Sequence, residues 1–99
     1  MAMKVLIVED EIMAQKYLIR NLTQNFPDIE IVGMTNSIKS TVSWLKEPDN
    51  FADIIFMDVE LADGVCFEIF RQHDVKAKVI MTTAYDSYAI KAFEAGSID

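Results

Sequence analysis

The chain has 99 residues, enough for one hydrophobic core, and its 52% hydrophobic and 25% charged residues are typical of a folded domain. A formal net charge of -7 argues against a surface for nucleic acid or anionic membrane, because such surfaces carry clustered Lys and Arg. Cys66 is the only cysteine, so an internal disulfide is excluded, and no apolar run approaches the roughly 20 residues that span a bilayer. Without a secretory signal pattern at the N-terminus, we expect a cytoplasmic domain.

Short apolar runs alternate with stretches of helical spacing, and this pattern predicts a parallel sheet covered by helices. Asn36 or Ser37 is the expected cap of the second helix, which should end near Pro48. The alternation of strands and helices along the chain favours a flavodoxin-like α/β fold with strand order 2-1-3-4-5, in which the fifth strand and helix are missing from this chain. The predicted strands are residues 4–8, 29–33, 54–57 and 78–82, and the predicted helices are residues 11–25, about 38–47, 65–72 and about 86–95.

Acidic side chains follow two strands that the predicted order makes neighbours. Glu9, Asp10 and Glu11 come directly after the first strand, and Asp58 follows the third. Ligand sites of open parallel sheets lie at the carboxyl ends of the strands, so we expect these carboxylates to converge. Any one of them alone would be interpreted as a solvated loop residue, but together they repel unless a divalent cation such as Mg²⁺ lies among them. A carboxylate in such a site can itself accept a phosphoryl group.

The runs KVLIVEDE, IIFMDVEL and VIMTTAY resemble the receiver (CheY-like) domains of two-component response regulators, and the resemblance covers the whole chain. It implies that Asp58 is the phosphoacceptor. It also implies that Glu9, Asp10 and Asp58 hold Mg²⁺ together with the backbone carbonyl of Glu60. A sensor histidine kinase would be the donor, and the domain would act as a signalling switch rather than as an enzyme that turns over a substrate.

The end of the fourth strand offers two hydroxyl residues for contact with the phosphoryl group. The resemblance favours Thr83, which is followed by alanine, and it implies that Thr83 reports phosphorylation; Thr82 is interpreted as a β-branched residue that fills the strand. The segment TAYDSYAIKAFEAGSID resembles receivers attached to LytTR-type DNA-binding domains. This implies a transcription regulator whose DNA-binding output domain lies elsewhere in the parent chain, so that this domain itself does not bind DNA.

The chain departs from the family pattern in two places. The loop from Asp58 to the Asp63-Gly64 turn is shorter than in many receivers and lacks their Met-Pro pair. The family's lysine after strand five, and the aromatic switch residue before it, would lie beyond Asp99, so we interpret residues 1–99 as a receiver domain that is incomplete at the C-terminus. The fourth strand would then be an exposed edge carrying the apolar run Val79-Ile80-Met81, which predicts self-association or a homodimer.

Two alternatives remain open. The first is a receiver-like interaction module that does not exchange phosphate. The second is a phosphatase-like enzyme with an Asp nucleophile, which is less favoured because no Asp-x-Asp motif or Gly-rich phosphate loop follows the first strand. His73 is expected to be solvent-exposed rather than a phosphohistidine, and Cys66 to be a small buried residue on the third helix.

Overall fold

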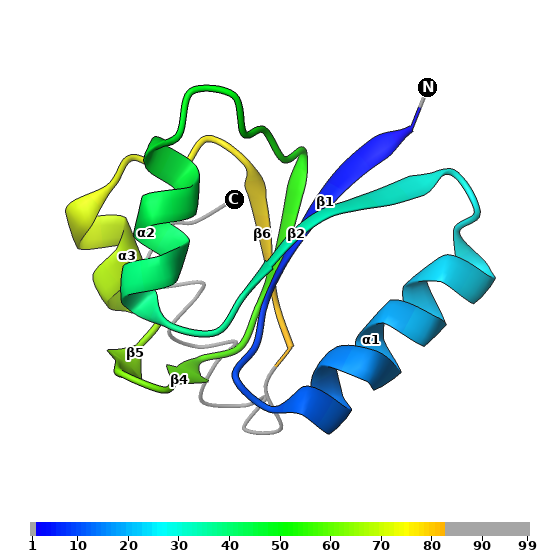
Figure 1. The fold of residues 1–99 in the computed structure, drawn as a ribbon, viewed down its shortest axis with the longest axis horizontal. Helices are drawn as coiled ribbons and strands as arrows, with labels where there is room; N and C mark the ends of the chain where they lie inside the picture. The colour runs from blue at the N-terminus through cyan, green and yellow to red at the C-terminus, as the bar shows by residue number, and fades with distance from the viewer. Residues whose placement is uncertain (1, 83–99) are drawn as a thin grey trace.

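The computed structural model describes residues 2 to 82, so Thr83 and the helix predicted at about 86–95 lie outside the described residues. Four parallel strands form a sheet in the order β2-β1-β3-β6, with α1 on one face and α2 and α3 on the other (Figure 1). The short strands β4 and β5 form a separate hairpin, so β6 is the fourth strand of the main sheet along the chain. The predicted order 2-1-3-4 of these strands is therefore confirmed. Within residues 2 to 82 no helix is long and apolar enough to cross a membrane. The elements are β1 (Met3–Val8), α1 (Ile12–Asn25), β2 (Ile29–Thr35), α2 (Ile38–Lys46), β3 (Ile54–Met57), β4 (Glu60–Leu61), β5 (Gly64–Val65), α3 (Phe67–Gln72) and β6 (Lys78–Met81).

The continuous apolar run of β1 is buried on both faces of the sheet. Val5 and Ile7 belong to the core beneath α1, where they join Leu22. Leu6 and Val8 belong to the core beneath α2 and α3. Successive side chains of a strand point to opposite faces, so a strand covered by helices on both sides needs apolar residues at every position.

The strand β2 has a bulge, and its Gly33 lies close to Trp44 of α2. Val5 pairs with Ile31 and Leu6 with Gly33, so the register shifts by one residue between these pairs. A Cβ atom on Gly33 would lie 2.5 Å from Nε1 of Trp44, closer than real Cβ contacts come. Glycine is therefore required at this position by the close approach of the indole ring.

The third helix begins later than the sequence predicts. Residues 60 to 65 form a two-stranded antiparallel hairpin, β4–β5, and α3 starts at Phe67, so the prediction that Val65 and Cys66 are helical is wrong. Gly64 has φ +145°, a conformation that L side chains rarely adopt, which lets the chain reverse at this turn. Leu61 is buried in the core and anchors the hairpin, while Cys66 takes the N-cap position of α3.

Candidate functional site

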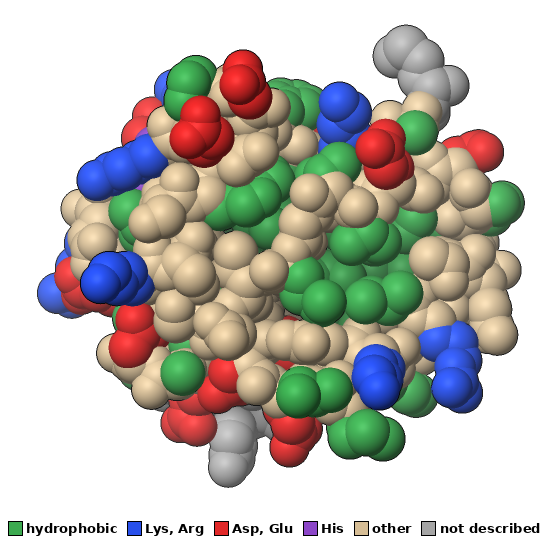
Figure 2. All heavy atoms as spheres, viewed as in Figure 1, with side chains coloured by type: hydrophobic (Ala, Val, Ile, Leu, Met, Phe, Trp, Pro, Cys, Tyr) green, Lys and Arg blue, Asp and Glu red, His purple; other side chains and the backbone are tan. Residues whose placement is uncertain are grey.

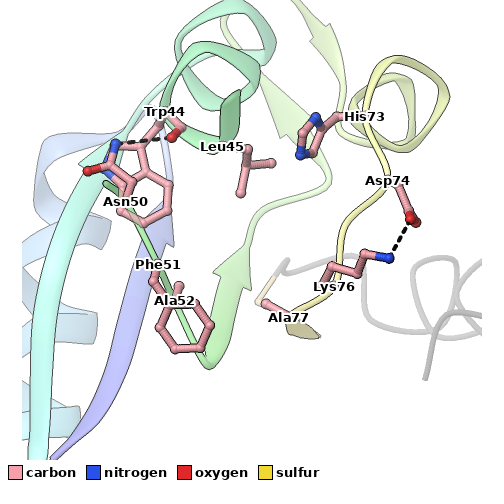
Figure 3. Close-up of a pocket in the computed structure, with 9 residues that line it drawn as sticks. All are labelled: Trp44, Leu45, Asn50, Phe51, Ala52, His73, Asp74, Lys76 and Ala77. Carbon is pink, nitrogen blue, oxygen red and sulfur yellow. Dashed lines mark hydrogen bonds and ion pairs between the residues drawn. The ribbon is translucent and has the colours of Figure 1, made fainter. Parts of the chain in front are cut away.

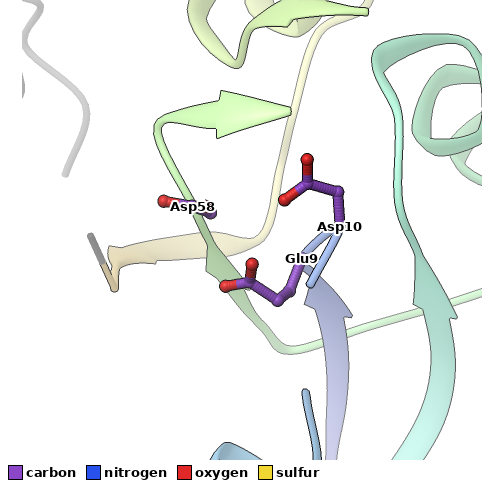
Figure 4. A group of neighbouring side chains, drawn as sticks. All are labelled: Glu9, Asp10 and Asp58. Atoms are coloured by element: carbon purple, nitrogen blue, oxygen red, sulfur yellow. The ribbon is translucent and has the colours of Figure 1, made fainter. Parts of the chain in front are cut away.

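The register of the sheet places Glu9 and Asp58 side by side. Val8 pairs with Met57, and the next backbone hydrogen bond runs from the Asp58 N–H to the Val8 carbonyl at 2.9 Å. One carboxylate oxygen from each of Glu9, Asp10 and Asp58 lies within 4.8 Å of the others (Figure 4). The predicted convergence of acidic side chains at the carboxyl ends of β1 and β3 is therefore present. Acidic side chains also line the lower edge of the molecule in Figure 2, the edge at which β1 ends in Figure 1.

Glu9 is a buried carboxylate, with 7% of its surface exposed. Burial is the main cause that raises the pKa of Glu9 from the ordinary 4.5 to about 7, and the charges of Asp58 and Asp10 add to this rise. The hydrogen bond from the Glu11 N–H to Oε2, 3.1 Å long, opposes it. Its backbone is fixed on two sides, since its N–H donates to the Thr35 carbonyl at 2.9 Å and its carbonyl accepts from the Gln15 side-chain amide at 2.6 Å.

The pKa of Asp58 is also raised. Burial is the main cause, and the nearby charge of Asp10 adds to it, whereas hydrogen bonds from the backbone N–H groups of Val59 and Glu60 and from the Glu9 side chain oppose it. The surroundings of Asp58 therefore disfavour its ionised form when no cation is bound.

No lysine or arginine compensates these carboxylates within the part of the chain that the structure describes. The two ion pairs there join Arg71 to Glu68 and Lys76 to Asp74, both on or after α3. Three carboxylates that share one small volume, two of them with raised pKa values, form a donor set suited to a hard divalent cation. The chemistry of the cluster thus fits the Mg²⁺ that the sequence analysis expects.

The remaining residues of the predicted site lie nearby or outside the described part. Glu60 opens β4, two residues after Asp58, and its N–H is one of the groups that lower the Asp58 pKa. Thr82 follows β6, and its N–H donates to the Met57 carbonyl at 3.0 Å. Because Met57 pairs with Met81, Thr82 lies next to Asp58 at the carboxyl ends of β6 and β3. Its Oγ1 is buried and has no hydrogen-bond partner among the described residues. Thr83 is not described, so the choice between the two hydroxyl residues stays a prediction.

Cys66 and His73 have no catalytic arrangement. Cys66 is fully buried as predicted, and burial, followed by the charge of Asp58, raises the pKa of its thiol to about 12. The expectation that His73 is solvent-exposed is wrong, because it is half-buried and lines a hollow of about 140 Å³ together with Trp44 and Lys76 (Figure 3). This hollow lies beside the amino ends of β3 and β6, whereas the acidic cluster lies at the carboxyl end of β3.

One residue of structural consequence was not recognised from the sequence. The sequence indicates only a turn at Asp63, yet its carboxylate accepts hydrogen bonds from the N–H groups of Ile38 and Lys39 at the start of α2. The partners are 25 and 24 positions away, so no local spacing could have indicated the contact.

Comparison with known proteins gives a consistent result. The model of the response regulator receiver domain matches residues 5–99. The chain is 33% identical to the sensory transduction protein LytT of Bacillus anthracis over 100 residues, which covers 98% of this chain and 39% of LytT. It is 38% identical to the transcriptional regulatory protein BtsR of Salmonella typhi, covering 97% of this chain and 40% of BtsR.

A solved structure supports the same assignment. The response regulatory domain of protein mrkE from Klebsiella pneumoniae is 34% identical, with a TM-score of 0.72 over 98% of this chain and 80% of that one. The chain spans about two fifths of the length of the curated relatives named above. The sequence-based resemblance to receivers of LytT-type regulators is thereby confirmed. The chain belongs to the response regulator receiver domain family.

Proposed function

We propose that this receiver domain accepts a phosphoryl group on Asp58 from a sensor histidine kinase and passes the signal to an output domain in its parent protein. The observation that carries the proposal is the cluster of Glu9, Asp10 and Asp58, whose carboxylate oxygens lie within 4.8 Å of one another without a compensating ion pair in residues 2 to 82. Such an arrangement is unfavourable unless a cation binds there, and the bound cation can then attract an anionic phosphoryl group.

The chain's own residues provide the nucleophile and its setting. One carboxylate oxygen of Asp58 attacks phosphorus in line, so that an O–P bond forms while the P–N bond of the donor phosphohistidine breaks. The electron pair of that bond stays on the imidazole nitrogen of the donor. Asp58 is held for this attack by its backbone bond to Val8 and by the N–H groups of Val59 and Glu60.

Glu9, Asp10, Asp58 and the Glu60 carbonyl would hold Mg²⁺, with Glu9 acting through water. When bound, Mg²⁺ supplies positive charge that stabilises the oxygens of the transferred group. The pKa of Glu9, raised to about 7, supports this role. The raised pKa reflects a buried carboxylate among other negative charges, and a cation bound in the cluster would offset these charges and favour the ionised form. Acidic conditions should therefore weaken metal binding.

The readout is proposed from the resemblance. Thr83 would contact a phosphoryl oxygen, and the following helix would change its arrangement, a local change of charge with effects at a distance. A LytTR-type DNA-binding domain is the proposed output in the parent protein, supported by the similarity to LytT and to the transcriptional regulator BtsR. The receiver domain itself, with a net charge of -7, would not contact DNA.

Treatment with acetyl phosphate separates this proposal from a receiver-like module that has lost phosphotransfer. With Mg²⁺ present, intact mass spectrometry should show one added phosphoryl group on the parent chain and none on Asp58→Asn. A matched control is Asp53→Asn, which makes the same chemical change at the loop before β3. If the parent chain binds Mg²⁺ but gains no phosphoryl group, the interaction-module alternative is correct.

A further inference from the structure

The tip of the β4–β5 hairpin is attached to the N-terminus of α2, 24 and 25 positions earlier in the chain. The Asp63 carboxylate accepts from the Ile38 N–H at 2.6 Å through one oxygen and from the Lys39 N–H at 3.1 Å through the other. These hydrogen bonds lower the pKa of Asp63, so the carboxylate is ionised at neutral pH. A negative charge is also favourable at the N-terminus of a helix.

The N-terminus of α2 is completely satisfied by two groups. Asp63 accepts from the first two N–H groups of the helix, while Ser37 accepts from the next two, through Oγ for Ser40 and through its carbonyl for Thr41, both at 3.0 Å. The two caps serve the same helix, but they differ in origin. Ser37 is local to α2, whereas Asp63 belongs to the loop that follows Asp58.

The hairpin is fixed at three levels. At its base the Cys66 N–H donates to the Val59 carbonyl at 2.7 Å, and in its middle Leu61 is buried. Its tip is held by Asp63 and by a longer bond of 3.5 Å from the Ala62 N–H to the Asn36 carbonyl. The tip is thus hydrogen-bonded both to the turn between β2 and α2, at Asn36, and to the first residues of α2, while Leu61 packs in the same core as Ile38.

The end of β2, just before that turn, supports the acidic cluster. Thr35 ends β2, and its carbonyl accepts the N–H of Glu9 at 2.9 Å. Asp63 therefore links the hairpin that begins with Glu60 to the first residues of α2, and α2 begins three positions after Thr35, whose carbonyl holds the Glu9 N–H.

We propose that Asp63 is a positioning residue of the acidic site, which ties the hairpin to α2 and so keeps the Glu60 carbonyl in place relative to Asp58 and Glu9. This inference rests on the proposed function, in which that carbonyl is a metal ligand. Groups that orient the ligands of a metal typically contribute about 10 to 100-fold to its affinity. Loss of the tie should act on the metal and on phosphorylation without altering any of the three carboxylates.

The test compares Asp63→Ala, Asp63→Asn and Ser37→Ala in Mg²⁺ titrations followed by NMR and in rates of phosphorylation by acetyl phosphate. Ser37→Ala is the matched control, because it removes a cap of the same helix but leaves the hairpin attached. Asp63→Ala should weaken Mg²⁺ binding by about tenfold or more and slow phosphorylation, while Ser37→Ala changes each less than about twofold. Asp63→Asn, which keeps one acceptor oxygen, should recover part of the loss.

Equal losses of Mg²⁺ affinity in Asp63→Ala and Ser37→Ala would overturn the inference, because the effect would then come from helix stability alone. Unchanged affinity in Asp63→Ala would overturn it too. Amide hydrogen exchange over residues 60 to 65 provides a readout that needs no metal, and it should accelerate in Asp63→Ala only. If the parent chain itself binds no Mg²⁺, the proposed function fails, and unaltered exchange in this hairpin would separately refute the tie.

Discussion

The buried Glu9 carboxylate should make the metal-free protein less stable as the pH rises. Its pKa is about 7 in the folded chain, against 4.5 ordinarily, so the folded state binds more protons than the unfolded state between these two values. Stability from this group is therefore fully present below about pH 4.5 and is lost as the pH rises through 7. At about 1.4 kcal/mol per pKa unit, the total loss is about 3 kcal/mol.

Glu9→Gln removes this titration while keeping a similar shape and an acceptor for the Glu11 N–H. In EDTA at about pH 8 the variant should be more stable than the parent chain by up to about 3 kcal/mol, and at about pH 5 the difference should be small. Urea unfolding followed by circular dichroism at several pH values measures this difference. Glu30→Gln makes the same charge change at an exposed position of β2 and serves as the control.

Addition of Mg²⁺ should reduce the advantage of the variant, because a cation that binds the folded state more tightly stabilises it more, and the variant lacks one carboxylate of the site. A difference in unfolding free energy between the parent chain and Glu9→Gln that does not change with pH would refute the reasoning. The same conclusion would follow if Glu30→Gln showed an equal pH dependence.

Three further predictions concern packing, reactivity and assembly. Gly33→Ala should lower the free energy of unfolding in urea by about 1 to 3 kcal/mol, because the new Cβ would meet Trp44 at 2.5 Å; an unchanged midpoint would contradict this. Cys66, buried and with a thiol pKa of about 12, should react with a thiol reagent at about pH 8 no faster than the protein unfolds, and rapid labelling of the native chain would refute its burial. Ile80→Lys at the β6 edge should reduce self-association in light scattering more than Ile12→Lys on α1 does, and equal effects would exclude this edge.

The sheet could be predicted from the sequence because its two central strands, β1 and β3, contribute apolar side chains to the cores on both faces. The apolar runs of β1 and β3 have no polar residue within them, and only a strand covered on both faces requires this. The acidic cluster followed from that order, since Glu9 and Asp58 end neighbouring strands. That Glu9 is almost fully buried could not be predicted, because neighbouring Asp10 and Glu11 have the same chemistry and are exposed.

The β4–β5 hairpin escaped prediction for a different reason. Each of its strands has two residues, too few to show the alternation that marks a strand. Its attachment to α2 through Asp63 joins residues that are 24 and 25 positions apart, and the turn chemistry of Asp63-Gly64 gives no sign of it. Long-range caps of this kind become visible only when the tertiary structure is known.

The central claim is that Asp58 accepts the phosphoryl group, and chemical mapping tests it most directly. The chain would be incubated with acetyl phosphate and Mg²⁺, reduced with borohydride, which converts an aspartyl phosphate to homoserine, and digested for peptide mass analysis. Homoserine should appear at position 58, only when both Mg²⁺ and acetyl phosphate are present, and not at Asp10. Homoserine at another aspartate, or its absence from a chain that binds Mg²⁺, would contradict the assignment.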